Sequence, residues 1–133
     1  MLKGIGIDLV EIQRFSHWES YGSRLQKVFT QEEIDYCLKN RTLSAARFAT
    51  RFAAKEALYK ALSPYITQPT SFQTLCRHCS ITVSATGPHM NVNWEKLGFP
   101  LGVSNPPQIH LSLTHTATTA GAVVICEIAD NPN

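Results

Sequence analysis

The segment from residue 47 to residue 62 constrains the fold more than any other part of the chain, because small residues recur in it at helical spacing. It reads RFATRFAAKEALYKAL. An α-helix repeats every ~3.6 residues, so the alanines fall on one narrow face and the aromatic residues on another. The alanines on the narrow face are Ala49, Ala53, Ala57 and Ala61, together with Ala46 just before the segment. A helix with such a face lets another element approach it closely.

Short elements are predicted around this helix. The length of 133 residues fits one domain, which we take to span residues 1–133. A capping box at Thr30 and Glu33 predicts a helix ending near residue 40, whereas residues 65–77 have no clear period and are predicted to be a loop. The apolar run at residues 4–12 predicts a strand buried on both faces. Further strands are predicted at residues 80–85, 90–93, 109–115 and 120–128.

Composition argues against two broad classes of function. The net charge of +2 is far below that of a protein that neutralises many phosphates, so nucleic-acid binding is not expected. No apolar run approaches the roughly 20 residues that span a bilayer, and the first residues lack the pattern of a signal peptide. We expect a cytoplasmic protein without membrane contact. Cys76 and Cys79 could bind zinc, but a single C-x-x-C is more often a pair of free thiols.

Two carboxylates have no obvious structural purpose. Asp8 lies inside the apolar run at residues 4–12, where an isolated charge is costly unless it is paired or binds a cation. A buried salt bridge or a backbone cap would explain it as well as a metal would. Glu56 could simply pair with Lys60 one helical turn later. If the two carboxylates converge, they form an oxygen site suited to Mg²⁺.

Cations on the long helix are compatible with a phosphate-bearing ligand. A polyanion lying along the helix could meet Arg51, Lys55 and Lys60, although a solvated helix face would explain them too. Ser112 and His115 end a predicted strand beside a threonine-rich loop, where a hydroxyl and an imidazole could also contact phosphate. A lone histidine at such a place is more often a surface or packing residue.

Three segments of the chain together resemble the holo-[acyl carrier protein] synthase family, the short type of 4′-phosphopantetheinyl transferase. GIGIDLVEI at residues 4–12 is similar to the N-terminal block of the family, and RFAAKEALYKAL at residues 51–62 is similar to its signature helix. HLSLTHT at residues 110–116 resembles its last conserved strand, and the spacing of Phe29, Thr30 and Glu33 also fits. The match in order and spacing makes the resemblance specific.

The resemblance implies an activity and an assembly. Members of the family transfer the 4′-phosphopantetheine arm of coenzyme A to a serine of apo acyl carrier protein in fatty acid biosynthesis, with Mg²⁺ as cofactor. They release adenosine 3′,5′-bisphosphate. The implied fold is a compact α+β domain with a small, mostly antiparallel sheet packed against a long helix. The implied assembly is a homotrimer with active sites between neighbouring subunits.

The resemblance also implies roles for individual residues. It identifies Asp8 and Glu56 as Mg²⁺ ligands and Lys60 as a contact of the pyrophosphate and part of the catalytic machinery. The proton of the serine would pass to Glu56 or to His115. Coenzyme A would be bound by Arg51, Lys55, Lys60, Ser112 and His115.

The partner implied is an acidic helix of the carrier protein. Arg14, Arg24 and Lys27 near the first predicted helix are candidates for docking it, and ordinary surface charge is the alternative.

The chain departs from the family at residues 63–66, where SPYI replaces the usual G-T-G-I. The competing functions are a metal-dependent phosphohydrolase that uses the same carboxylates and a catalytically silent module that binds coenzyme A or the carrier.

Overall fold

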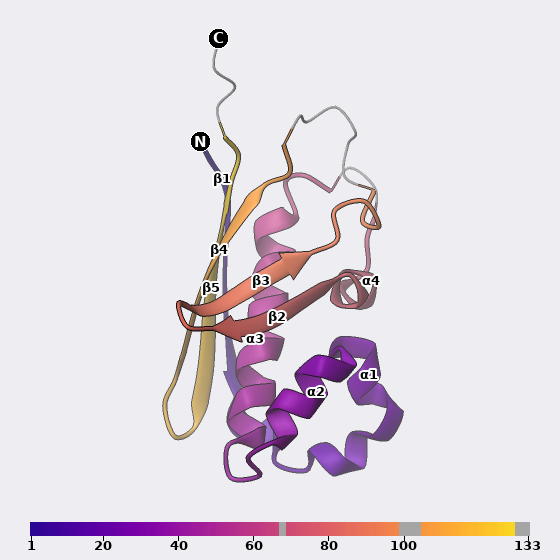
Figure 1. Ribbon diagram of the computed structural model, residues 1–133, viewed down its shortest axis with the longest axis vertical. Helices are drawn as coiled ribbons and strands as arrows, with labels where there is room; N and C mark the ends of the chain where they lie inside the picture. Colours follow the sequence, from indigo (N-terminus) through magenta and orange to yellow (C-terminus); the bar gives the residue numbers. More distant parts are fainter. Residues whose placement is uncertain (67–68, 99–104, 130–133) are drawn as a thin grey trace.

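A long central helix organises the fold, which we describe from a computed structural model for residues 1–66, 69–98 and 105–129. Helix α3 (Ser44–Leu62) lies against a three-stranded antiparallel sheet (Figure 1). In that sheet β5 (Thr119–Glu127) lies between β1 (Leu2–Glu11) and β4 (Gln108–His115), so β1 and β4 form its two edges. A separate antiparallel hairpin pairs β2 (Cys79–Ser84) with β3 (Gly87–Val92). These layers confirm the expected α+β architecture.

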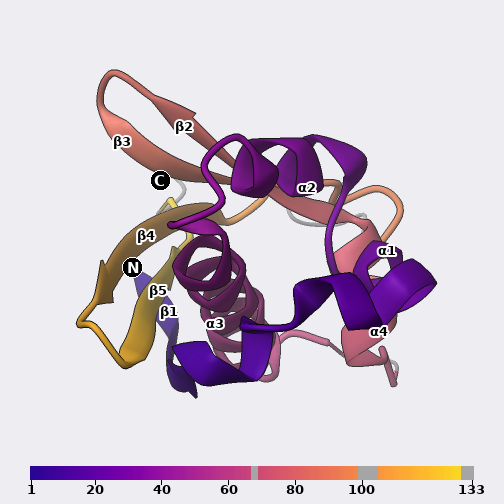
Figure 2. The ribbon, with the colours of Figure 1, turned by 90° about the horizontal axis from the view of Figure 1, so that it is seen from below.

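Short helices cover the sides of α3 that the sheet leaves open. Figure 2 shows α3 nearly end-on, with the three-stranded sheet on one side and the short helices arranged around the others. Two 3₁₀ helices follow β1, and three further α-helices complete the set: η1 (Ile12–Phe15), η2 (Trp18–Arg24), α1 (Leu25–Val28), α2 (Gln31–Leu38) and α4 (Phe72–Arg77). None of the helices in the described ranges is both long enough and apolar enough to cross a membrane.

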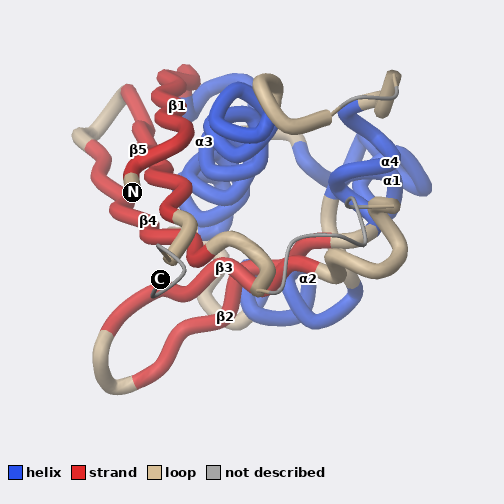
Figure 3. The backbone as a smooth tube through the Cα atoms, turned by 90° about the horizontal axis from the view of Figure 1, so that it is seen from above, coloured by secondary structure: helices blue, strands red, loops and turns tan. Residues whose placement is uncertain are grey.

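Local signals explain where the short helices begin. The predicted capping box at α2 is present, because the Thr30 hydroxyl accepts from the Glu33 amide and the Glu33 carboxylate accepts from the Thr30 amide. The prediction of a loop at residues 65–77 is wrong for its last part, which forms α4. Ser71 caps that helix by accepting a hydrogen bond from the amide of Thr74, at 3.1 Å. A tube view separates these helices from the strands (Figure 3).

The packing of β1 on α3 depends on glycine. Gly4 and Gly6 face the helix, and a Cβ atom built on Gly6 would lie 2.7 Å from the carbonyl carbon of Ala57 and 3.0 Å from the nitrogen of Ala61. Only a residue without a side chain fits here. The alanine face of α3 therefore packs against a strand face that also carries little side-chain volume.

The prediction that β1 is buried on both faces is wrong for the single chain. Its inward residues alternate with Ile5, Ile7 and Leu9, which are 63%, 60% and 69% exposed on the outer face of the sheet. A continuous apolar run does not distinguish a strand buried on both faces from one that keeps an apolar outer face. The outer face of β1 is thus available to another surface.

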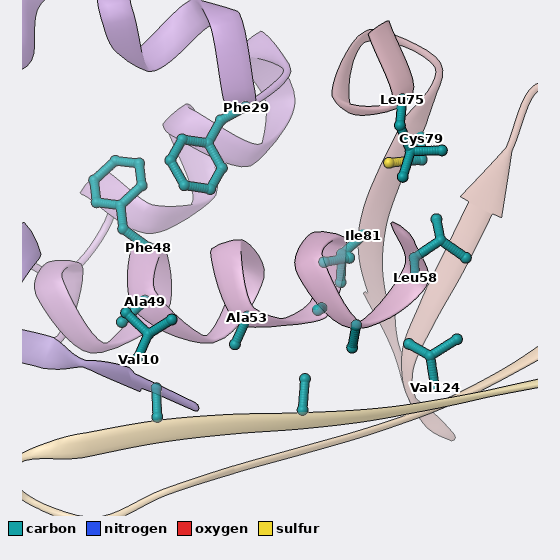
Figure 4. Close-up of a cluster of buried hydrophobic side chains, with 14 of the residues drawn as sticks. Val10, Phe29, Phe48, Ala49, Ala53, Leu58, Leu75, Cys79, Ile81 and Val124 are labelled. Atoms are coloured by element: carbon teal, nitrogen blue, oxygen red, sulfur yellow. The ribbon is translucent and has the colours of Figure 1, made fainter. Parts of the chain in front are cut away.

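The core lies on both sides of α3 (Figure 4). On the sheet side, Val10 and Val124 pack near the small residues of the helix, and on the opposite side Phe29 and Phe48 pack with ring centroids 5.1 Å apart. Leu75 joins the same core from α4. The helix is therefore held along most of its length.

The cysteines are part of this core and form no metal site among the residues that the structure covers. Cys76 lies in α4 and Cys79 begins β2, and both are buried. Burial raises the pKa of the Cys76 thiol to about 12 and that of Cys79 to about 11. No group of three or more histidine, cysteine or acidic side chains able to hold a metal is found in the described ranges. The two thiols are packing residues and not members of a loop.

Candidate active site

Asp8 and Lys60 meet where β1 packs on α3. Asp8 belongs to the inward-facing series of β1 and so points toward the helix. Lys60 Nζ donates to the Asp8 carboxylate at 3.2 Å and to the carbonyl oxygen of Ile7 at 2.9 Å. The Asp8 side chain remains 17% exposed and that of Lys60 52% exposed, so an external ligand can reach both.

Glu56 lies in the same electrostatic environment. Burial raises the pKa of its carboxyl group, and the negative charge of Asp8 raises it further, whereas Lys60 and Arg14 lower it. Lys60 donates to Asp8 and not to Glu56, so the helical pair that would have explained Glu56 is not formed. Two carboxylates that oppose each other's ionisation are stabilised by a shared cation. This donor set fits Mg²⁺, which is usually held by one or two protein carboxylates together with water and phosphate oxygens.

Arg51 and His115 lie at the other edge of the sheet. They line a cavity of about 300 Å³ between α3, the end of β4 and the β2–β3 hairpin, which contributes Val83 and Pro88. Asp8 belongs to edge strand β1, whereas His115 belongs to edge strand β4, and β5 lies between them. One chain therefore keeps Asp8, Glu56 and Lys60 together but does not bring His115 to them.

Ser112 is not part of that cavity. It is exposed on β4, and its register partner on β5 is Val123, which places it on the outer face of the sheet with Ile7. The Ser112 hydroxyl is thus directed to the same side as the exposed apolar residues of β1.

Lys55 is predicted to line the coenzyme pocket, but its position in the fold does not agree with that prediction. Its ammonium group is fully buried and donates to Glu33 at 2.6 Å, to the carbonyl oxygen of Val28 at 2.7 Å and to those of Cys79 and Cys76 at 3.2 and 3.4 Å. The other carboxylate oxygen of Glu33 accepts from the amide of Ile81. A cation enclosed in this way cannot meet a ligand, and its role is to join α1, α2, α4 and β2 to α3.

The three residues predicted to dock the carrier lie together. Arg14, Arg24 and Lys27 line a groove of about 260 Å³ whose walls include Phe29 and Phe52. The guanidinium carbon of Arg14 lies 4.6 Å from the centre of the Phe52 ring. Because Arg14 also lowers the pKa of Glu56, this groove is close to the carboxylate site.

Sequence reasoning missed three residues around these sites. Glu33 was identified only as a helix cap, because its partner Lys55 is 22 residues away. Arg47 lies one turn before Arg51, and this spacing was a usable signal. Tyr36 gave no signal, because it reaches the two arginines from another helix.

Comparisons with known proteins agree on one family. A sequence model of the 4′-phosphopantetheinyl transferase superfamily matches residues 4–119. The chain is 38% identical over 128 residues to a holo-[acyl-carrier-protein] synthase of Treponema denticola, covering 96% of this chain and 99% of that protein. It is 36% identical over 129 residues to the enzyme of that name from Geotalea daltonii, covering 96% and 99%.

A solved structure supports the same relationship. The fold is similar, with a TM-score of 0.69 and 28% identity, to a crystal structure of a holo-(acyl-carrier-protein) synthase from Bacillus anthracis in complex with CoA (3′,5′-ADP). The match covers 97% of this chain and 99% of that one.

Proposed function

Because the chain belongs to the 4′-phosphopantetheinyl transferase superfamily, we propose that it transfers the 4′-phosphopantetheine arm of coenzyme A to a serine of apo acyl carrier protein. The observation that carries the proposal is the convergence of Asp8, Glu56 and Lys60 at the contact between β1 and α3. These residues come from two of the three segments on which the family resemblance rests. The products are holo carrier protein and adenosine 3′,5′-bisphosphate, and fatty acid biosynthesis is the process served.

In this proposal the residues at β1 and α3 bind the pyrophosphate of coenzyme A. Asp8 and Glu56 would hold Mg²⁺, which when bound neutralises charge on the pyrophosphate oxygens. The half-exposed ammonium group of Lys60 supplies a second positive charge beside them. Phosphoryl transfer needs little beyond positioning and charge neutralisation, so this small set of residues is sufficient.

The transfer step is an in-line substitution at the phosphorus that carries the pantetheine arm. The serine oxygen forms the new bond to phosphorus, and the bond to the oxygen of adenosine 3′,5′-bisphosphate breaks. The serine proton passes to a base, for which Glu56 is the first candidate because it is a carboxylate at the proposed pyrophosphate site. His115, at the opposite edge of the sheet, is the second.

A homotrimer would complete the coenzyme site. Asp8 lies at the β1 edge and His115 at the β4 edge of one sheet, so a coenzyme bound between two chains could meet Asp8 of one chain and His115 of the next. The exposed Ile5, Ile7 and Leu9 offer an apolar face for that association.

Mixing two inactive variants tests the shared site. Asp8→Ala removes one half-site and Arg51→Met removes the other. After co-refolding in equal amounts, about a quarter of the sites of a closed ring combine two intact halves, and activity should return to that fraction. No return of activity in stable mixed trimers would show that each site lies within one chain.

The groove at Arg14, Arg24 and Lys27 would receive the carrier. Its cations complement an acidic helix, and its aromatic walls can take an apolar side chain of that helix. The effect of Arg14 on Glu56 indicates that a serine carried by the docked helix would lie near the carboxylates.

The function is tested by the mass of apo acyl carrier protein incubated with the protein and coenzyme A, with and without Mg²⁺. The carrier should gain the phosphopantetheine mass only with Mg²⁺ present, and Asp8→Ala and Glu56→Ala should each abolish the gain. Asp35→Ala is the matched control, because Asp35 is an exposed carboxylate on α2. Phosphate released from coenzyme A without carrier would instead indicate a phosphohydrolase. Binding without turnover in either assay would indicate a silent module.

A further inference from the structure

An aromatic ring holds two guanidinium groups at the cavity on the β4 edge. The guanidinium carbons of Arg47 and Arg51 lie 4.5 and 4.4 Å from the centre of the Tyr36 ring. The arginines are one turn apart on α3, whereas Tyr36 comes from α2. All three residues line the cavity of about 300 Å³ that also contains His115.

Hydrogen bonds fix this arrangement. Arg47 Nη1 donates to the carbonyl oxygen of Tyr36 at 3.1 Å, and Arg51 Nη1 donates to the carbonyl oxygen of Arg47 at 3.3 Å. Arg51 is only 4% exposed, yet its Nε has no hydrogen-bond partner in the structure. A buried guanidinium N–H without an acceptor is costly, so the protein itself does not fully compensate the Arg51 guanidinium group.

The charges around the cavity define the ligand. Two cations one turn apart on a helix repel each other, and the negative face of the Tyr36 ring offsets that repulsion. Among the described residues that line the cavity there is no carboxylate. The site therefore favours an anion, and paired guanidinium groups are well suited to a phosphate.

We propose that Tyr36 is a positioning residue that holds Arg47 and Arg51 as a clamp for the ribose phosphate of the donor. This inference rests on the proposed function, in which the pyrophosphate of coenzyme A lies at Asp8 and Glu56 and only the phosphate monoester on the ribose remains to be bound. Arg47 doubles the positive charge at that phosphate, and Tyr36 makes the clamp rigid before the donor arrives. The clamp makes the protein select donors that carry this phosphate.

Steady-state kinetics with coenzyme A and dephospho-coenzyme A test the proposal. Tyr36→Leu should raise KM for coenzyme A about tenfold, while its kcat and its KM for dephospho-coenzyme A stay unchanged. Tyr36→Phe keeps the ring and should restore the wild-type KM. Arg47→Gln should raise KM for coenzyme A in the same selective way, and it serves as the second variant if Tyr36→Leu does not fold.

The control is Arg41→Gln. Arg41 is exposed and its guanidinium carbon lies 5.9 Å from the centre of the Trp18 ring, outside the cavity. Its loss should change neither KM. An equal rise in KM for both donors in Tyr36→Leu, or no rise for coenzyme A, would overturn the proposal.

A binding measurement separates this inference from the proposed function. If the wild-type protein transfers nothing from either donor, the proposed function fails. Calorimetry with adenosine 3′,5′-bisphosphate and with adenosine 5′-monophosphate then tests the clamp by itself. Wild type should prefer the first nucleotide and Tyr36→Leu should lose that preference. Equal affinity of wild type for the two nucleotides would contradict the clamp.

Discussion

Replacing Gly6 by alanine should separate the two elements that carry the catalytic carboxylates. An added Cβ would lie 2.7 Å from the carbonyl carbon of Ala57 and 3.0 Å from the nitrogen of Ala61, both of them backbone atoms of α3. Carbon atoms pack best at about 3.5–4.0 Å, and the carbonyl oxygen of Ala57 would lie closer to the added Cβ than either of these atoms, so β1 and α3 must move apart by at least about 1 Å. No rotation of a side chain can relieve this contact.

Two effects of that separation can be estimated. Overpacking of this kind lowers the free energy of unfolding by about 1–3 kcal/mol. Asp8 is two residues beyond Gly6 on the same face of β1, and Glu56 directly precedes Ala57, so the carboxylates move apart with the backbone. A misplacement of about 1 Å at a reacting centre lowers the rate about 100-fold.

Urea denaturation followed by circular dichroism measures the first effect, and the mass shift of apo carrier protein measures the second. Gly121→Ala is the control in the same sheet, because its Cβ would press only on side chains, those of Leu9 at 3.0 Å and Thr114 at 3.5 Å, and would lie at ordinary van der Waals distance, 3.7 Å, from the carbonyl oxygen of Asp8. The control should keep nearly wild-type stability and rate. If Gly6→Ala equals wild type in both measurements, the close contact between β1 and α3 does not position the carboxylates.

Two substitutions and one experiment on the unchanged protein test other parts of the structure. Lys55→Met should lower the free energy of unfolding by about 3–5 kcal/mol in urea denaturation, because it leaves the carboxylate of Glu33 buried without its cation; a loss below about 1 kcal/mol would contradict this role. Arg24→Glu should raise KM for the carrier, most strongly at low salt, and leave KM for coenzyme A unchanged; equal changes in both would argue against docking at this groove. In the native protein the buried thiols should react slowly with a disulfide reagent at pH 8 and rapidly only after unfolding. Burial raises the pKa of Cys37, Cys76 and Cys79 above the ordinary 9.0, so these thiols ionise first in the unfolded chain. The free energy of unfolding should therefore fall as pH rises above 9. Fast labelling of the native protein would show that these three thiols are not buried.

The sequence predicted correctly those helix features that depend on residues close together in the chain. The capping box at Thr30 and Glu33 satisfies backbone groups within one helical turn, so it could be identified without any tertiary information. The alanine face of α3 predicted close packing for a similar reason. Helix α4 was missed because the helix is only six residues long and its neighbours have no helical period. Its one local signal is the single cap residue Ser71.

Tertiary structure decided the roles of side chains that look alike in the sequence. Lys55 and Lys60 are cations on one helix, yet Lys55 is enclosed by carbonyl oxygens and Glu33, while Lys60 remains half exposed beside Asp8. The partner of each lies far away in the chain, and spacing along one helix carries no information about it. The sequence alone therefore determined the family, the long helix and the candidate carboxylates. Only the fold determined which cations face a ligand, because burial and pairing depend on contacts between distant segments.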